Sequence, residues 1–379
     1  MIIIVGSGIS ALWTADLLDK SGYEVAVLEK DTVANSQTIA SQGMIHGGTK
    51  YSLDGALTKA TISISDMPNI WKEALRGNGK VNLSKSVIHS NYQLLWSADT
   101  VQSKLLSFFG SKAMSSKMRQ INKKEHPLFN NKDFHGSLFK LNEIVVDVHS
   151  VASNFSNNLE GKIFKAKAKK ILFSGNDIVG IDTCKGKLEC DELILAAGEG
   201  NEEILEESNI NSFPMQRRPL AMGMVFMKEK IPDIYGHFLG TSSRPRITIS
   251  THYLNEKQIL YIGGEVSESG VSLSDEDQKI QIDKFLREAL SWIDLDIERI
   301  DVLRINRAET KNNKVLKPDS FFIGRKKGLM VCWPTKLAFA PLIAESILNQ
   351  MNPSKLRKRN IKRMRLDKPH ISKYPWEAN

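Results

Sequence analysis

Three small residues near the N-terminus have the spacing of a phosphate-binding turn. Gly6, Gly8 and Ala11 follow an apolar run of strand length, and Glu29 ends the next apolar run. Gly6 permits a tight turn, Gly8 lets the backbone approach a pyrophosphate, and Ala11 keeps the following helix close to the strand. Glu29 can accept hydrogen bonds from the hydroxyl groups of a ribose. Together these residues suit the chemistry of a dinucleotide site.

Hydrophobic patterning predicts the elements that must position these residues. We expect residues 1–5 to form a strand buried on both faces, residues 12–20 a helix, and residues 23–28 a second strand. A helix that begins at such a turn offers unpaired backbone N–H groups to an anion. The same spacing would also suit a tight strand–helix turn without a ligand. The flanking strands and the terminal acid favour the dinucleotide site.

Other segments add a polar loop, a second sheet and a helix to this picture. The loop over residues 35–51 is rich in glycine and serine and contains His46, so its backbone could lie flat against a large planar ligand. Residues 215–266 have the pattern of an antiparallel sheet. Residues 103–124 have that of a basic helix. The chain is therefore expected to combine a parallel and an antiparallel sheet.

Composition excludes several classes of protein. Charged residues make up 25% of the 379 residues and hydrophobic ones 41%, which is typical of a globular chain. The three cysteines are too few for a disulfide framework and lack metal-ligand spacing. No apolar run approaches the roughly 18 residues needed to span a bilayer. Because residues 1–5 already form a predicted strand, no signal peptide is expected, and we predict a cytoplasmic location.

The net charge of +9 is concentrated at the C-terminus. Residues 355–379 hold nine basic and two acidic side chains, a charge of +7, so the rest of the chain carries only +2. Such a segment suits an anionic surface, and we predict peripheral contact with the inner face of the membrane. The alternative is a tail that only keeps the protein in solution.

With these segments identified, the sequence resembles the FAD-dependent oxidoreductases of the D-amino-acid-oxidase superfamily. The resemblance rests on the turn over residues 6–11 with Glu29, on residues 193–198, and on residues 333–340. Gln37 and Thr38 followed by residues 43–46 are most similar to the L-2-hydroxyglutarate dehydrogenase branch. Residues 45–48 with Tyr51 also resemble FAD-dependent glycerol-3-phosphate dehydrogenases.

The resemblance implies an α/β fold in which a Rossmann-like FAD-binding domain is interleaved with an antiparallel-sheet substrate domain. The FAD-binding domain would comprise residues 1–78, 145–212 and 305–352, and the substrate domain residues 79–144 and 213–304, with a basic tail over 353–379. The helix that begins at Thr335, Lys336 and Leu337 would face the flavin, where its N–H groups would stabilise negative charge on the reduced ring. The implied FAD-binding residues are Gly6, Gly8, Ser10, Ala11, Glu29, Lys30, Ser36, Thr38, Ser41, Gln42, Gly43, Met44, Ala168, Ala196, Gly198, Thr335, Lys336 and Leu337.

Four residues are candidates for substrate binding or catalysis. His46 could be a base beside the flavin or could only support its loop. Arg307 could fork onto a substrate carboxylate or phosphate, or form a structural salt bridge with Glu309. Tyr51 could bind substrate, although packing is the more common role. His252 is the weakest candidate, at the end of a predicted strand.

The expected function is oxidation of a small anionic 2-hydroxy acid or polyol phosphate, with hydride transfer to flavin N5. No second dinucleotide fingerprint and no redox cysteine pair is seen in the sequence, so electrons are expected to pass to oxygen, a quinone or a carrier protein. One alternative is an amino-acid or secondary-amine oxidase or dehydrogenase of the same superfamily. A second is a flavin-dependent tRNA-modifying enzyme, although a nucleic-acid partner is not expected. A third is a non-catalytic flavoprotein.

Overall fold

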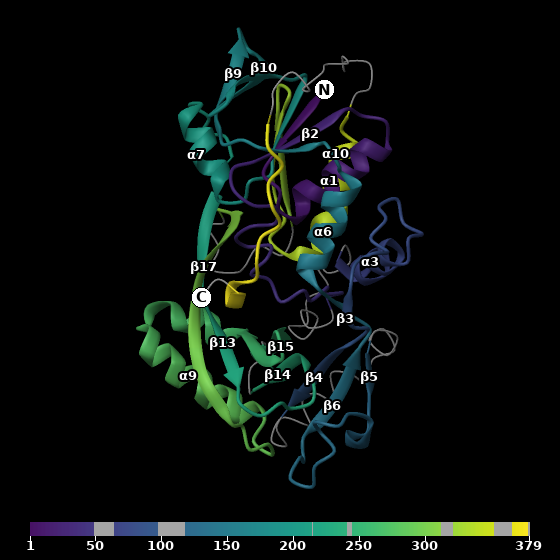
Figure 1. Cartoon of the computed structure of the whole chain (residues 1–379), viewed down its shortest axis with the longest axis vertical. Coiled ribbons are helices and arrows are strands. Elements are labelled where there is room, and N and C mark those ends of the chain that lie inside the picture. The colour runs from purple at the N-terminus through teal and green to yellow at the C-terminus, as the bar shows by residue number, and fades with distance from the viewer. Residues whose placement is uncertain are drawn as a thin grey trace.

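The computed structural model describes residues 1–48, 64–97, 118–213, 215–240, 245–311, 321–351 and 366–377. Two large sheets lie at opposite ends of an elongated molecule, as Figure 1 shows. None of the helices in these segments is long and apolar enough to span a membrane.

The first sheet is built around the N-terminal strand. Its six strands lie in the order β18 (Phe322–Lys326), β19 (Leu329–Trp333), β12 (Glu192–Leu195), β1 (Ile2–Val5), β2 (Val25–Glu29) and β8 (Ile163–Lys165). All neighbours are parallel except β18 and β19. Ile4 pairs with Ile194 on one side and with Val27 on the other. This central position explains why the strand is apolar at every residue.

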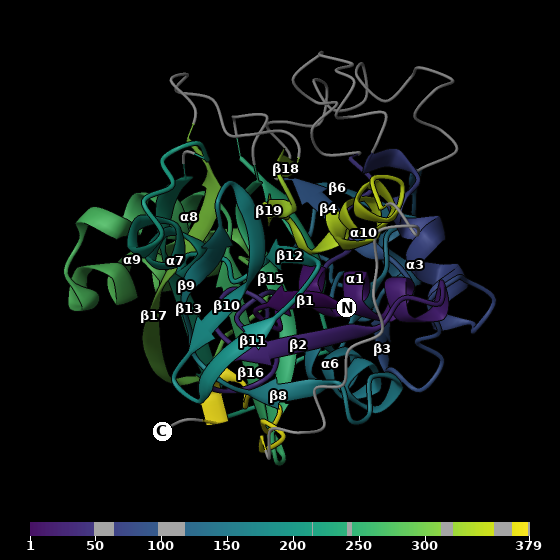
Figure 2. The same ribbon diagram turned by 90° about the horizontal axis from the view of Figure 1, so that it is seen from above.

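Alternate residues of β1 face two different layers. Ile2 and Ile4 pack with the helices, whereas Ile3 and Val5 pack with a small antiparallel sheet. Figure 2 shows α1 and α10 on one side and β9 and β10 on the other. The helices on the side of Ile2 and Ile4 are α1 (Ile9–Lys20), α3 (Met67–Leu75), α6 (Val148–Asn158) and α10 (Ala340–Leu348). The other side holds helix α7 (Gly200–Glu207) and the small sheet of β9 (Ala168–Ser174), β10 (Asp177–Thr183) and β11 (Gly186–Glu189).

The second sheet has eight strands, and all its neighbours are antiparallel except β4 and β14. In order, these are β17 (Ile297–Thr310), β13 (Met215–Met227), β16 (Lys257–Gly263), β15 (Pro245–Leu254), β14 (Tyr235–Leu239), β4 (Gln93–Ser97), β6 (Ser137–Leu141) and β5 (Met118–Gln120). Helix α9 (Asp275–Ala289) buries Ile282 and Leu286 against one face. The other face, with Leu220 and Met222, is turned toward the first sheet. Shorter elements are β3 (Ile88–Ser90), β7 (Val145–Val146), α8 (Glu265–Ser269), η3 (Lys123–Glu125), η4 (Gly270–Ser272), η5 (Leu337–Phe339) and η8 (Pro375–Glu377).

The fold class expected from the sequence is confirmed, with a mixed α/β architecture of parallel and antiparallel sheets. Two local features differ from the expectation. Strand β17 continues without a break across the predicted domain boundary between residues 304 and 305, because its pairing with β13 extends to Thr310. Residues 118–120, which we predicted as the end of a basic helix, form the edge strand β5 because Met118 pairs with Leu141.

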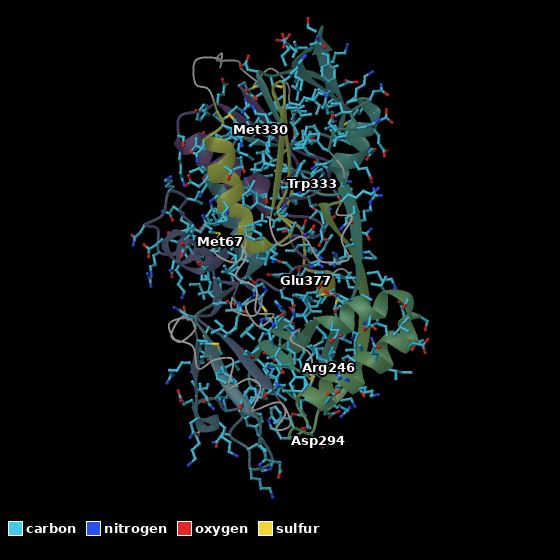
Figure 3. All side chains as sticks on the ribbon, turned by 180° about the vertical axis from the view of Figure 1, so that it is seen from behind. Met67, Arg246, Asp294, Met330, Trp333 and Glu377 are labelled. Carbon is cyan, nitrogen blue, oxygen red and sulfur yellow. The ribbon has the colours of Figure 1, made fainter. Side chains whose placement is uncertain are left out.

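The C-terminal residues 366–377 contact both the segment that follows β2 and the second sheet. The backbone N–H of Val33 donates to His370 (2.8 Å), and the N–H of Ser372 donates to Val33 (2.9 Å). The ring of Trp376 is buried against Tyr261 of the second sheet. Figure 3 shows Glu377 between Trp333 of the first sheet and Arg246 of the second in that view. This part of the predicted basic tail is therefore a structural segment, while residues 352–365 lie outside the described residues.

Candidate functional site

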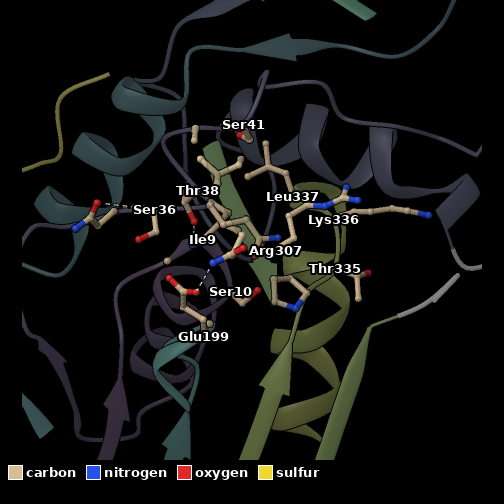
Figure 4. Close-up of a pocket in the computed structure, with 18 of the residues that line it drawn as sticks. Ile9, Ser10, Ser36, Thr38, Ser41, Glu199, Arg307, Thr335, Lys336 and Leu337 are labelled. Atoms are coloured by element: carbon tan, nitrogen blue, oxygen red, sulfur yellow. Dashed lines mark hydrogen bonds between the residues drawn. The ribbon is translucent and has the colours of Figure 1, made fainter. Parts of the chain in front are cut away.

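A cavity of about 850 Å³ lies between the two sheets. Figure 4 shows Ser10, Thr38, Arg307 and Leu337 arranged around it. Its wall comes from the turn after β1, the loop over residues 35–46, the end of β12, strands β13 and β17, and residues 334–337. The predicted cofactor and substrate residues on this wall are Gly6, Gly8, Ser10, Glu29, Lys30, Ser36, Thr38, Ser41, Gln42, Gly43, Met44, His46, Ala168, Ala196, Gly198, Arg307, Thr335, Lys336 and Leu337.

The turn after β1 can be built only with glycine at its first position. Gly6 has φ +96°, and a Cβ there would lie 2.6 Å from the Cα of Ala197. At Gly8 a Cβ would meet only the Thr38 hydroxyl, at 3.2 Å, so this position leaves space on the cavity side. The same hydroxyl accepts the N–H of Ile9 at 3.1 Å, which fixes the start of α1 against the loop (Figure 4).

Glu29 is held in place at the end of β2, with only 6% of the residue exposed. Its Oε2 accepts the backbone N–H of Ser7 at 3.0 Å and the Ser7 hydroxyl at 2.5 Å, while Oε1 accepts the N–H of Asp31 at 3.0 Å. Oε1 keeps acceptor capacity, because a carboxylate offers about four lone-pair sites, two on each oxygen, and Oε1 accepts one hydrogen bond whereas Oε2 already accepts two. A ribose diol could use this capacity.

The cavity wall carries buried polar atoms that fit a polar cofactor. The hydroxyl oxygens of Ser10 and Ser41 are buried, and neither has a hydrogen-bond partner among the described residues. Buried polar groups are normally satisfied, so these two atoms are suited to a bound ligand. With the glycine turn and Glu29, they match the requirements of a dinucleotide. The residues present therefore fit FAD.

The part of the cavity wall formed by residues 334–337 differs slightly from the prediction. Thr335 has φ +53°, and helical structure begins at Leu337 in η5, with Lys336 as the residue before it, and continues into α10. The predicted start at Thr335 is thus two residues early. Ala11 is fully buried and packs in the helical layer, which agrees with its expected role of keeping the helix close to the strand, but it does not line the cavity.

The loop that carries His46 contacts both β7 and the second sheet. Gly43 has φ +68°, and a Cβ there would lie 2.0 Å from the carbonyl oxygen of Val146, so the loop needs glycine at this position. The side-chain amide of Gln42 donates to the carbonyl oxygens of Thr248 (3.1 Å) and Tyr261 (2.8 Å) in the second sheet. These contacts place the loop between β7 and the second sheet.

His46 lines the cavity and contacts two buried residues that the sequence analysis missed. Its Nδ1 lies 3.5 Å from Oε2 of Glu143. Its ring centroid lies 5.5 Å from that of His237. No sequence signal marked either partner, since Glu143 is a lone acid before an apolar run and His237 lies within a strand.

Arg307 lines the cavity from β17. Its Nη2 lies 3.6 Å from Oε1 of Glu309, which is also bound more closely by Arg218, with Nε 2.8 Å from Oε2. The Nε and Nη2 atoms of Arg307 are buried and have no hydrogen-bond partner in the described part of the chain. The guanidinium group therefore combines a long ion pair with donors suited to an anionic ligand.

The two remaining candidates do not join this site. Tyr51 lies outside the described residues. His252 is buried on β15 and does not line the cavity; its Nε2 lies 2.9 Å from the Ser250 hydroxyl, and its ring centroid 4.5 Å from that of Trp376. Burial, with a smaller contribution from the nearby His89, lowers the pKa of His252 to about 3. His252 is thus a neutral, packed residue at ordinary pH.

Comparisons with known proteins agree with this geometry. Residues 1–347 match the family model described as "FAD dependent oxidoreductase", named DAO. The chain is 34% identical to the probable FAD-dependent oxidoreductase PA4991 of Pseudomonas aeruginosa, over 100% of this chain and 97% of that protein. The crystal structure of PA4991 superposes with a TM-score of 0.84 over 99% of this chain and 97% of that one, at 30% identity.

More distant solved structures share the fold. L-proline dehydrogenase from P. horikoshii has a TM-score of 0.70 at 14% identity, covering 93% of this chain and 94% of its own. Glycine oxidase from Geobacillus kaustophilus has a TM-score of 0.65 at 14% identity, covering 98% of this chain and 99% of its own. The match of the family model to nearly the whole chain, on a cavity that fits FAD, shows that this protein belongs to the DAO family of FAD-dependent oxidoreductases.

Proposed function

We propose that this FAD-dependent oxidoreductase oxidises a small anionic 2-hydroxy acid or polyol phosphate. The observation that carries the proposal is the presence of His46, backed by the Glu143 carboxylate, and Arg307 on the wall of one cavity. A base and a fixed cation are the two groups that oxidation of an anionic alcohol requires.

The need for a base distinguishes alcohols from amines. A hydroxyl group must lose its proton as the neighbouring carbon loses a hydride, whereas a neutral amine already has a lone pair available. An imidazole side chain is a suitable acceptor for that proton. His46 would therefore take the O–H proton and release it to solvent after the oxo product leaves.

Arg307 would bind the anionic group of the substrate. The planar guanidinium can form two parallel hydrogen bonds to a carboxylate or phosphate, and such bonds fix orientation as well as affinity. Its buried Nε and Nη2 atoms support this role. With the anion held by Arg307 and the hydroxyl directed to His46, the substrate would have one defined orientation.

The residues around the glycine turn would hold the cofactor. Gly6, Gly8 and the start of α1 would bind the pyrophosphate, and Glu29 the adenosine ribose. Bound FAD supplies the acceptor for the hydride that leaves the α-carbon of the substrate. We propose a non-nicotinamide acceptor for the electrons, because one dinucleotide fingerprint is found in the sequence.

Oxidation of an amino acid or secondary amine is the competing proposal. The solved structures of similar fold include L-proline dehydrogenase and glycine oxidase, both at 14% identity. At that identity they support the shared fold alone. The His46–Glu143 pair favours the alcohol, since an amine substrate has less need of a base.

The test is anaerobic reduction of the FAD-loaded protein by a panel of alcohols. The panel contains 2-hydroxy acids, polyol phosphates and the corresponding neutral alcohols, and flavin absorbance is recorded. We expect bleaching by at least one anionic member and none by its neutral counterpart. Equal bleaching by the neutral alcohols would contradict the role of Arg307, and no bleaching by any hydroxy acid or polyol phosphate would contradict the proposed function.

A further inference from the structure

The histidine loop and the segment before β7 form an antiparallel pair. The N–H of Ile45 donates to the carbonyl oxygen of Ile144 (3.0 Å), and the N–H of Val146 donates to that of Gly43 (2.9 Å). Met44 lies opposite Val145 in this pair. Two residues further along the same register, His46 lies opposite Glu143. Directly opposed residues of an antiparallel pair project to the same face, so the backbone itself brings these two side chains together.

Glu143 is behind the ring of His46 rather than in the cavity. The Glu143 side chain is 3% exposed, against 15% for His46, and only His46 lines the cavity. A Cβ on Gly47 would lie 3.2 Å from Oε1 of Glu143 and 3.0 Å from the Pro68 side chain. The space around the carboxylate is therefore closely filled, and its position is well defined.

A second buried side chain supports the ring of His46. His237 has Nδ1 2.9 Å from the Thr248 hydroxyl and Nε2 3.0 Å from Oε1 of Gln93. The Gln93 amide nitrogen donates to the carbonyl oxygen of Ile144 (3.2 Å). Its oxygen therefore faces His237 and accepts a hydrogen bond from Nε2–H. The same Ile144 carbonyl also binds Ile45, so one peptide group anchors both the loop of His46 and the support of His237.

We propose that Glu143 is a positioning residue that acts through His46. Its carboxylate selects the ring form with hydrogen on Nδ1 and leaves Nε2 as the atom that accepts the substrate proton. The negative charge also stabilises the imidazolium that forms when the proton is taken. This inference rests on the proposed function, in which His46 is the base.

In the described part of the chain, charged or titratable groups face this pair from neighbouring elements. His237 approaches from β14, and Arg307 shares the cavity from β17. Lys72 of α3 interacts electrostatically with Glu143, which opposes the lowering of the Lys72 pKa by burial and by Arg76. Within the pair, Oε2 of Glu143 lies 3.5 Å from Nδ1 of His46.

The first test compares Glu143→Gln with Glu192→Gln in the FAD-loaded enzyme. Glu192 is a similarly buried acid that pairs with Arg325 at 2.8 Å and does not line the cavity. In E143Q we expect kcat to fall about tenfold or more, because part of the roughly 10²–10⁴-fold effect of a base is lost, while KM changes little. We also expect the acidic limb of the pH profile to move to lower pH, since the ring loses its anionic partner. An unshifted limb, or the same kcat loss in E192Q, would overturn the proposal.

A double mutant tests whether Glu143 acts through His46. If it does, adding E143Q to H46N will cause no further loss of kcat, because the group on which it acts is already gone. Full additivity of the two effects would overturn the proposal.

A measurement on the resting enzyme separates this inference from the proposed function. Histidine-labelled, FAD-loaded protein is titrated without substrate, and the NMR signal of His46 is assigned by its loss in H46N. We expect the midpoint of its titration to move to lower pH in E143Q and not in E192Q. An unmoved midpoint would contradict the role of Glu143 whatever the substrate. Failure of all hydroxy acids and polyol phosphates to bleach the flavin would instead contradict the proposed function.

Discussion

The two ends of the cavity are built in opposite ways. At the nucleotide end, the wall includes the backbone and small side chains of the turn between β1 and α1, and at Gly6 there is no space for a single added carbon. At the substrate end, the wall includes polar and charged side chains from segments far apart in the chain, such as His46 and Arg307, and the buried Glu143 lies behind His46.

This difference predicts different responses to mutation. The nucleotide end should be damaged by adding atoms, since shape and exposed N–H groups do the binding. The substrate end should be damaged by removing functional groups or by changing the register that brings them together. Variants at one end should therefore affect FAD, and variants at the other should affect substrate.

The largest expected effect is that of Gly6→Ala. The new Cβ would lie within 2.9 Å of three backbone atoms of residues 196 and 197 and would require φ +96°. We expect a loss of about 3 kcal/mol or more in the free energy of unfolding, together with loss of FAD binding. Urea unfolding and FAD titration measure both.

The control for this variant is Gly175→Ala. Gly175 also has positive φ, +60°, but nothing lies within 4 Å of a Cβ there. Its cost should be only the backbone strain, about 1 kcal/mol, with FAD binding retained. If both variants lost the same free energy of unfolding and bound FAD equally well, the close approach of Gly6 to the backbone of residues 196 and 197, just after β12, would have no special importance.

At the substrate end, Arg307→Met should lower kcat/KM for the anionic substrate by about 10²-fold or more. The reason is the loss of charge-assisted hydrogen bonds, each worth about 1.5–3 kcal/mol. FAD affinity should change little. Arg217→Met is the matched control, since Arg217 is a half-exposed residue paired with Glu202 at 2.6 Å. A loss of FAD affinity equal to the loss in kcat/KM would contradict the separation of the two ends.

His252 should contribute to the pH dependence of the free energy of unfolding and should not take part in the reaction. Its pKa is lowered to about 3 by burial, below the ordinary value of 6.5, so the unfolded chain binds more protons between these values. Stability should therefore fall as pH drops from 6.5 toward 3, by at most about 1.4 kcal/mol per pH unit from this residue. Urea unfolding of the native protein and His252→Asn between pH 6.5 and 4.5 measures the slope. An identical slope in both would show that His252 does not contribute.

The smallest effect is expected for Glu29→Gln. The amide keeps the shape of the side chain but loses the charge that accepts hydrogen bonds from Ser7 and Asp31 and faces the cavity. We expect FAD affinity to fall about tenfold, the value of one charge-assisted hydrogen bond. Glu24→Gln, at an exposed position just before β2, is the control and should bind FAD normally. An unchanged dissociation constant for E29Q would remove Glu29 from the nucleotide end.

The nucleotide end could be predicted from sequence because its determinants are local. Glycine spacing, apolar strands and the acid at position 29 all lie within thirty residues, and the structure brings them to one cavity. The substrate end depends on pairing between distant strands. Glu143 meets His46 only through the register of Met44 with Val145, which no local pattern specifies.

Two further differences have the same origin. Residues 118–120 have a basic helical pattern, but tertiary pairing with β6 makes them a strand. The density of basic residues near the C-terminus suggested a tail that contacts an anionic surface or keeps the protein in solution, whereas in its described part Tyr374 and Trp376 are buried and stack with ring centroids 4.6 Å apart. Two aromatic residues close together were the available signal for this docked segment.

The most direct test of the central claim uses one pair of substrates with the same carbon skeleton, a 2-hydroxy acid and the corresponding amino acid. Both are mixed anaerobically with the FAD-loaded protein, and the rate of flavin bleaching is recorded for each. The cavity lined by His46 and Arg307, with Glu143 behind His46, predicts rapid bleaching by the hydroxy acid and slow or no bleaching by the amino acid. Bleaching by the amino acid alone would contradict the account and identify an amine-oxidising enzyme.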